Sequence, residues 1–140
     1  MKRTAAARWT GSLKEGSGTL TAPGGVLKNT PYSFATRFGD KAGTNPEELI
    51  AAAHAGCFSM AFSLMLGNAG FTPESIDTTA NLSLEQVGGG FSITAVHLDV
   101  HARIPKITPD QFQKIAADAK ANCPVSKVLN AKITMEAKLA

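Results

Sequence analysis

The alternation of apolar and polar positions divides the chain into short strands and helices. The predicted strands cover residues 3–9, 18–22, 32–38, 76–87, 91–104 and 132–139. The first three are short and are bounded by glycine-rich turns, which is typical of strands. The fourth and fifth flank a Gly-Gly-Gly turn, so we expect them to form a long hairpin.

Between these groups of strands the sequence predicts one long helix. Asn45 is a suitable N-cap, Pro46 suits the first helical position, and a glutamate three residues after the cap completes a capping box. Residues 49–66 are apolar on nearly every side, and Gly67 and Gly70 are expected to end the helix. A helix that is apolar all round is either buried or shared between subunits.

Two shorter helices follow the predicted hairpin. Thr108 and Pro109 begin one that extends to residue 121, and Pro124 begins a shorter one. Strands and helices are segregated along the chain, which indicates an α+β fold with an antiparallel sheet. A length of 140 residues predicts a single domain, residues 1–140.

Composition and charge narrow the classes of function. Apolar residues make up 44% and charged residues 18% of the chain, as in ordinary globular proteins. The net charge of +3 comes from scattered residues, which argues against nucleic-acid binding. His54, Ser59 and Ser63 interrupt the longest apolar run, so we expect no membrane span of ~20 residues. No apolar signal core follows the basic N-terminus. We therefore expect a soluble, cytoplasmic protein.

Common cofactor and metal motifs are absent. The chain has no phosphate-binding loop and no GxSxG elbow. Its two cysteines and three histidines form no CxxC or HExxH arrangement, so we expect no metal. His97 and His101 point to one face of a strand but lie ~13 Å apart, too far to share an ion. We interpret them as solvated histidines.

The two cysteines, Cys57 and Cys123, are the main candidates for chemistry. They are either buried small apolar residues or a redox pair. His54 lies one helical turn before Cys57, but we interpret it as a core histidine rather than a catalytic base. Burial raises the pKa of Cys57, whereas a helix N-terminus favours a thiolate at Cys123. Local physics alone therefore favours Cys123 as the nucleophile.

Two motifs resemble those of a known family. Residues 43–60 read GTNPEELIAAAHAGCFSM, and residues 123–126 read CPVS. Together with TRF at 36–38 and IDTTA at 76–80, they resemble the OsmC/Ohr family of thiol peroxidases, and in particular its osmotically inducible OsmC branch. The resemblance implies an OsmC-like fold with a long buried central helix. It also implies a peroxidase that reduces organic hydroperoxides, and hydrogen peroxide more weakly, in oxidative or osmotic stress defence.

The same resemblance implies roles for four residues. Cys57 matches the cysteine that attacks the peroxide and becomes a sulfenic acid, and Cys123 matches the cysteine that then forms a disulfide with it. Arg37 matches the arginine that stabilises the thiolate, and Glu47 matches the acid that orients this arginine. The resemblance implies no cofactor. Instead, it implies that an external dithiol, such as a lipoyl group on another protein, reduces the disulfide.

The spacing of these residues bears on assembly. Glu47 and Cys57 are ten residues apart, which is ~15 Å along a straight helix. Either the helix breaks, or Arg37 and Glu47 approach Cys57 from another subunit. We expect the second arrangement, an intertwined homodimer with its sites at the interface, which the family also implies.

The sequence is also compatible with two alternative functions. One is a redox sensor that uses the same cysteine pair, and the other is a small-molecule carrier without turnover. Five apolar side chains are candidates for a substrate pocket: Phe38, Phe58, Met60, Met65 and Phe71.

Overall fold

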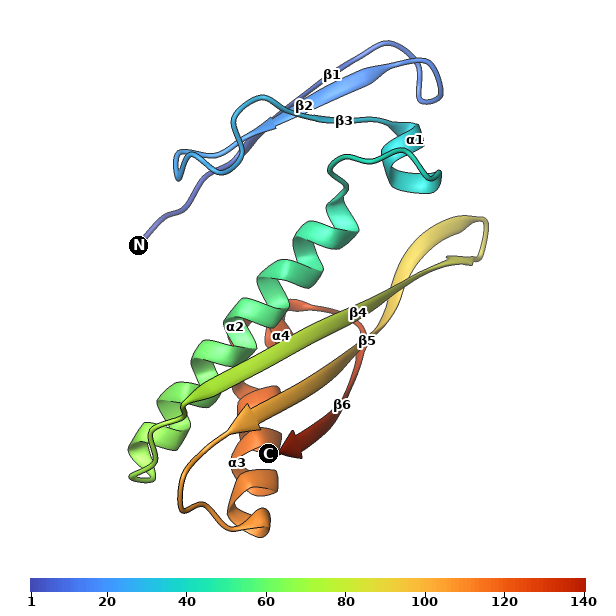
Figure 1. Ribbon diagram of the computed structural model, residues 1–140. Coiled ribbons are helices and arrows are strands. Elements are labelled where there is room, and N and C mark those ends of the chain that lie inside the picture. The colour runs from blue at the N-terminus through green and yellow to red at the C-terminus, as the bar shows by residue number, and fades with distance from the viewer. The chain divides into compact units, whose positions relative to one another are not determined.

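The computed structural model describes residues 1–140 and confirms the α+β class (Figure 1). The elements are β1 (Ala6–Thr10), β2 (Ser17–Thr21), β3 (Thr30–Tyr32), α1 (Phe34–Phe38), α2 (Pro46–Asn68), β4 (Ser75–Val87), β5 (Gly90–Arg103), α3 (Pro109–Asn122), α4 (Pro124–Val128) and β6 (Lys132–Leu139). The chain forms two compact units, Met1–Leu49 and Ile50–Ala140. The expectation of a single domain stays a prediction.

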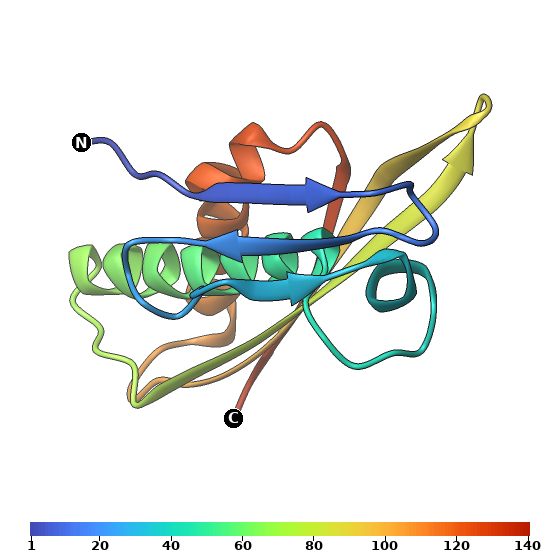
Figure 2. The ribbon, with the colours of Figure 1, turned by 90° about the horizontal axis from the view of Figure 1, so that it is seen from above.

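The first unit is built on an antiparallel sheet in the order β1-β2-β3 (Figure 2). Gly18 on the central strand faces Trp9 on one neighbour and Tyr32 on the other. A Cβ at this position would lie 2.5 Å from the Tyr32 ring and 2.7 Å from the Trp9 ring. Glycine therefore lets the two rings pack together across the strand, with their centres 5.4 Å apart.

The strand predicted at residues 32–38 is wrong, because β3 ends at Tyr32 and α1 begins at Phe34. Ser33 and Thr36 form a reciprocal capping box. The Thr36 N–H donates to Ser33 Oγ (3.3 Å), and the Ser33 N–H donates to Thr36 Oγ1 (2.9 Å). Two satisfied backbone donors stabilise a helical turn in a segment that also has strand-like apolar residues. This turn positions Arg37.

Helix α2 begins and ends as its sequence predicts. The Glu48 N–H donates to the side chain of Asn45 at 2.8 Å, which is the expected N-cap bond. At the other end Gly70 has a φ of +87°, and the Phe71 N–H donates to the Leu66 carbonyl at 2.8 Å. Gly67 lies within the last turn, so Gly70 is the glycine that ends the helix.

One face of α2 is buried, and the opposite side is exposed in the single chain. The buried residues recur at every fourth position: His54, Phe58, Phe62 and Leu66. On the other side Met60 is 77% and Leu64 is 65% exposed. We expected no helix long and apolar enough to span a membrane, but α2 is one by length and composition. The three polar residues His54, Ser59 and Ser63 lower its mean hydropathy too little to change this. A helix that packs in a protein core meets the same criterion.

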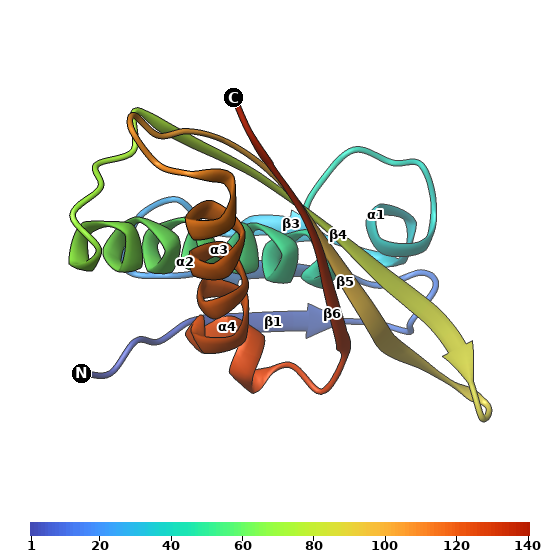
Figure 3. The same cartoon turned by 90° about the horizontal axis from the view of Figure 1, so that it is seen from below.

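The second unit contains a sheet in the order β4-β5-β6. The β4–β5 hairpin is antiparallel as predicted, but β6 pairs parallel to β5. The sheet is therefore mixed, because α3 and α4 form a crossover that returns the chain before β6 begins. Helix α3 runs across α2 (Figure 3), and both helices share one core with the inner face of β5. In this core the Phe62 ring centre lies 5.7 Å from those of Phe58 and Phe112.

Candidate active site

The two cysteines meet within the second unit. Cys57 lies on α2, and Cys123 is the N-cap of α4. Both are free thiols. The Cys57 thiol makes a side-chain hydrogen bond with Cys123 and accepts a hydrogen bond from the backbone of Val125. The fold therefore brings together two cysteines that are far apart in the sequence.

The two thiols differ in exposure and in environment. Cys123 is wholly buried, whereas Cys57 is partly exposed. Burial raises the pKa of the Cys57 thiol, and its hydrogen bond with Cys123 and the Cys123 charge raise it further. The backbone hydrogen bond from Val125 acts in the opposite direction and offsets only part of this rise. A reactive thiolate at Cys57 thus requires a further positive charge.

His54 is bound to Ser126 rather than to Cys57. Its Nε2 atom lies 2.7 Å from Ser126 Oγ, and the side chain is wholly buried. Burial lowers the pKa of His54, so the buried ring is neutral near pH 7. Its Nδ1 atom is buried without a hydrogen-bond partner. These contacts agree with the interpretation of a core histidine. Ser126, which is the last residue of the CPVS motif, was not predicted as a partner of His54; it lies three residues after Cys123, at the start of α4.

Arg37 and Glu47 form a two-point ion pair within the first unit. Arg37 Nη2 donates to Glu47 Oε1 at 2.7 Å, and Arg37 Nε lies 3.1 and 3.2 Å from the two carboxylate oxygens. The Glu47 side chain is 14% exposed and that of Arg37 is 38% exposed. The structure contains the Arg37–Glu47 pair that the family resemblance implies, and the catalytic roles of the two residues stay predictions. The pair fixes the orientation of a guanidinium that remains open to a ligand.

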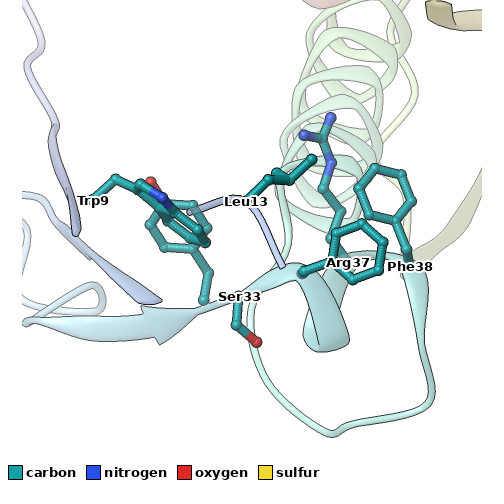
Figure 4. A pocket seen from close by; sticks show the side chains of 7 residues that line it. Trp9, Leu13, Ser33, Arg37 and Phe38 are labelled. Atoms are coloured by element: carbon teal, nitrogen blue, oxygen red, sulfur yellow. The ribbon is translucent and has the colours of Figure 1, made fainter. Parts of the chain in front are cut away.

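A mainly aromatic pocket of about 260 Å³ adjoins Arg37 in the first unit (Figure 4). It is lined by Trp9, Leu13, Tyr32, Ser33, Phe34, Arg37 and Phe38. The Arg37 guanidinium carbon lies 5.1 Å from the centre of the Phe38 ring. The pocket thus combines apolar rings with one cation. Trp9 and Leu13 were missed from the sequence, because only the pairing of β1 with β2 brings them to Arg37.

The other four apolar residues expected to line a pocket lie elsewhere. Phe58 is a fully buried core residue, and Met60 is exposed on α2. Met65 and Phe71 pack against the core of the second unit. The core interpretation is therefore correct for three of these four residues.

The outer face of the second sheet carries a further polar cluster. His97 Nδ1 lies 2.6 Å from Thr134 Oγ1, and His97 Nε2 lies 3.3 Å from Asp99 Oδ1. With Glu136, these residues place three donor atoms within 4.8 Å of one another, as a divalent cation would require. Exposed ion pairs often show the same arrangement, and the absence of a metal stays a prediction. Only the β5–β6 register brings Glu136 beside Asp99.

Comparison with known proteins gives consistent matches. A family model described as "OsmC-like protein" matches residues 39–138. The chain is 56% identical to "Peroxiredoxin OsmC" of Escherichia coli K12 over 133 residues, which is 95% of this chain and 93% of that protein. It is 32% identical to "Organic hydroperoxide resistance protein-like 1" of Staphylococcus epidermidis over 67% of both chains.

The solved structures that resemble the chain agree with these matches. The crystal structure of the organic hydroperoxide resistance protein OhrB of Bacillus subtilis superposes with a TM-score of 0.74 at 27% identity. The superposition covers 96% of this chain and 98% of that one. An OsmC-like protein from Vibrio cholerae superposes with a TM-score of 0.79 at 20% identity, over 99% of both chains, which supports the fold.

Proposed function

Because the chain belongs to the OsmC-like protein family, we infer that it is a thiol-dependent peroxidase that reduces organic hydroperoxides. One observation carries this inference beyond the family match. The fold brings a partly exposed cysteine into hydrogen-bond contact with a buried one, which is the arrangement that a two-cysteine redox cycle needs.

We propose that Cys57 attacks the hydroperoxide and that Cys123 resolves the product. The Cys57 thiolate attacks the terminal peroxide oxygen, the O–O bond breaks, and an alcohol and a Cys57 sulfenic acid form. Cys123 then displaces water from this sulfenic acid and forms the Cys57–Cys123 disulfide. The burial of Cys123 supports this order of events, since a wholly buried thiol cannot meet a bulky hydroperoxide first.

Arg37 is proposed to activate the Cys57 thiol. Burial and Cys123 raise the pKa of Cys57, and a guanidinium beside the sulfur would lower it again. Glu47 binds Arg37 through a bidentate ion pair, which holds the guanidinium in one orientation. The aromatic rings beside Arg37 would accept the organic part of the hydroperoxide.

The geometry of α2 supports a dimeric site. The helix runs unbroken from Pro46 to Asn68, so Glu47 and Cys57 are separated by ~15 Å along it. An Arg37–Glu47 pair bound at the start of α2 is therefore proposed to serve Cys57 of a second copy. The exposed apolar side of α2 also needs a cover, and an intertwined homodimer would provide one.

The remaining steps of the cycle are also proposals. An external dithiol, such as a lipoyl group on another protein, would reduce the disulfide by thiol–disulfide exchange, and no bound cofactor would be needed. We propose that the protein works in the cytoplasm, where such dithiols are kept reduced. A redox sensor or a carrier would show no sustained turnover with a dithiol, which separates these two alternatives from a peroxidase.

The test is a thiol count before and after one equivalent of cumene hydroperoxide, with peptide mapping under non-reducing conditions. We expect the loss of two thiols and a peptide linked through Cys57 and Cys123. Cys57→Ser should abolish the reaction, whereas Cys123→Ser should consume one thiol and leave a sulfenic acid. Two thiols that persist in the wild-type protein after minutes would refute the peroxidase assignment.

A further inference from the structure

A second polar link lies beside the two cysteines. His54 precedes Cys57 by three residues on α2, and Ser126 follows Cys123 by three residues at the start of α4. Residues three apart in a helix lie on the same side. The Cys57–Cys123 contact and the His54–Ser126 hydrogen bond of 2.7 Å therefore form two adjacent connections between the same two helices.

The buried position of His54 indicates that this link has a purpose beyond packing. The imidazole is wholly buried among core residues, and its Nδ1 atom has no partner. An apolar side chain of similar size would fill this position without an unsatisfied polar atom. What the histidine supplies, and an apolar residue could not, is a directional hydrogen bond from α2 to Ser126.

Helix α4 has few other contacts that fix its orientation. It contains five residues, none of them buried, and Cys123 makes no side-chain capping bond. Val125 and Leu129 are only partly buried against the core. The Val125 N–H nevertheless bonds to the Cys57 sulfur, so the orientation of this turn determines what the sulfur meets.

We propose that His54 and Ser126 are positioning residues, which hold the first turn of α4 so that the Cys123 sulfur stays in line for attack on oxidised Cys57. This inference rests on the peroxidase cycle proposed above. In the step concerned, the Cys57 S–OH bond breaks and an S–S bond forms. The Cys123 thiol proton leaves with the hydroxide as water, so no further oxidant or reductant is required.

The positioning matters because a second reaction competes with disulfide formation. Another hydroperoxide molecule oxidises the sulfenic acid to sulfinic acid, which a dithiol does not reduce. The ratio of sulfinic acid to disulfide therefore rises linearly with hydroperoxide concentration, and its slope is inversely proportional to the rate of disulfide formation. A turn of α4 that moves more freely brings Cys123 into line less often and steepens this slope.

The experiment compares wild-type protein with three variants of the full chain. Ser126→Ala removes the hydrogen bond to His54. Ser126→Thr keeps a hydroxyl group that can form this hydrogen bond. Lys127→Ala alters an exposed neighbour on the same turn. Each protein is treated with increasing cumene hydroperoxide without reductant, and mass spectrometry measures disulfide and Cys57 sulfinic acid. We expect Ser126→Ala to steepen the slope about fivefold, because a change of this size corresponds to the loss of one hydrogen bond. The other two variants are expected to retain the wild-type slope.

Three further measurements assign the effect to disulfide formation and check that the variants are folded. The rate of sulfinic acid formation is measured in Cys123→Ser and in Cys123→Ser combined with Ser126→Ala, and we expect equal rates. Thermal unfolding checks that every variant is folded. The slope is also measured in His54→Gln, which keeps a side-chain amide for the hydrogen bond to Ser126, and in His54→Leu, which does not. We expect His54→Gln to change the slope less than His54→Leu does.

The possible failures are distinguishable. A wild-type slope in Ser126→Ala, an equal increase in Lys127→Ala, or a sulfinic acid rate that explains the whole change would each overturn the positioning role while leaving the peroxidase intact. A wild-type protein that forms no Cys57–Cys123 disulfide would refute the proposed function itself, and the positioning role with it.

Discussion

A charge on the exposed side of α2 should separate the proposed dimer, and Leu64→Asp is the sharpest such change. Leu64 is 65% exposed in the single chain, so a monomer gains little from it. Full burial of a leucine contributes ~1.5–3 kcal/mol, which gives roughly 1–2 kcal/mol for the exposed part and roughly 2–4 kcal/mol for two copies. That loss alone weakens association roughly 30- to 1,000-fold. Two carboxylates in an apolar interface add several kcal/mol each.

Sedimentation velocity at micromolar concentration measures this effect directly. We expect a dimer for the wild-type chain and a monomer for Leu64→Asp. The matched control is Ser83→Asp, which adds the same charge to the exposed outer face of β4 and should leave the dimer intact. Urea unfolding provides a second measurement, because only a dimer has a midpoint that depends on protein concentration.

Two results would refute this reasoning. A wild-type chain that sediments as a monomer, or a Leu64→Asp protein that stays dimeric, would show that α2 is not covered by a second copy. Activity tests the placement of Arg37 separately. If Arg37 acts on Cys57 of the partner, the Leu64→Asp monomer loses the oxidation step, and a fully active monomer would contradict that placement.

Three further predictions concern the site residues. Arg37→Ala should slow the oxidation of Cys57 about a hundredfold in stopped-flow measurements. Arg37→Lys should not restore the rate, because an ammonium cannot match both oxygens of Glu47. An unchanged rate in Arg37→Ala would argue against the role of Arg37. Cys123→Ala should lower the pKa of Cys57, since the Cys123 thiol raises it, and the pH profile of iodoacetamide alkylation should move to lower pH, not higher. Burial lowers the pKa of His54, so below about pH 6.5 the unfolded chain binds a proton that the folded chain does not. The stability of the wild-type protein relative to His54→Gln, measured by urea unfolding, should therefore decrease as the pH falls below that value, and a constant difference would contradict this.

The elements with strong local signals were predictable from the sequence. The N-cap at Asn45 and the glycine turn between β4 and β5 were correct because each depends on residues only a few positions apart. The segment at residues 32–38 contains a helical turn where a strand is predicted, because its apolar residues suit a strand whereas the Ser33–Thr36 capping box favours a helix. Here a pair of polar side chains outweighed the apolar pattern.

Features that depend on long-range packing were not predictable in the same way. The parallel pairing of β6 follows from the path of the crossover helices, which no local pattern records. The same limit applies to the pocket beside Arg37, since Trp9 reaches it only through the pairing of β1 with β2. The Arg37–Glu47 pair, by contrast, was correctly inferred, but from the family resemblance rather than from spacing.

The order of the two cysteines shows how tertiary structure can reverse a local argument. From its position before Pro124, Cys123 is the better nucleophile, because the start of a helix favours a thiolate. In the folded chain Cys123 is wholly buried, and it is the sulfur of Cys57 that accepts the Val125 N–H. The Val125 N–H at the start of α4 therefore stabilises a thiolate at Cys57 rather than at Cys123. Since Cys57 is also the more exposed of the two, access and hydrogen bonding both favour it as the attacking thiol. The net rise in the pKa of Cys57 is the reason that a cation, Arg37, is proposed to act on this thiol.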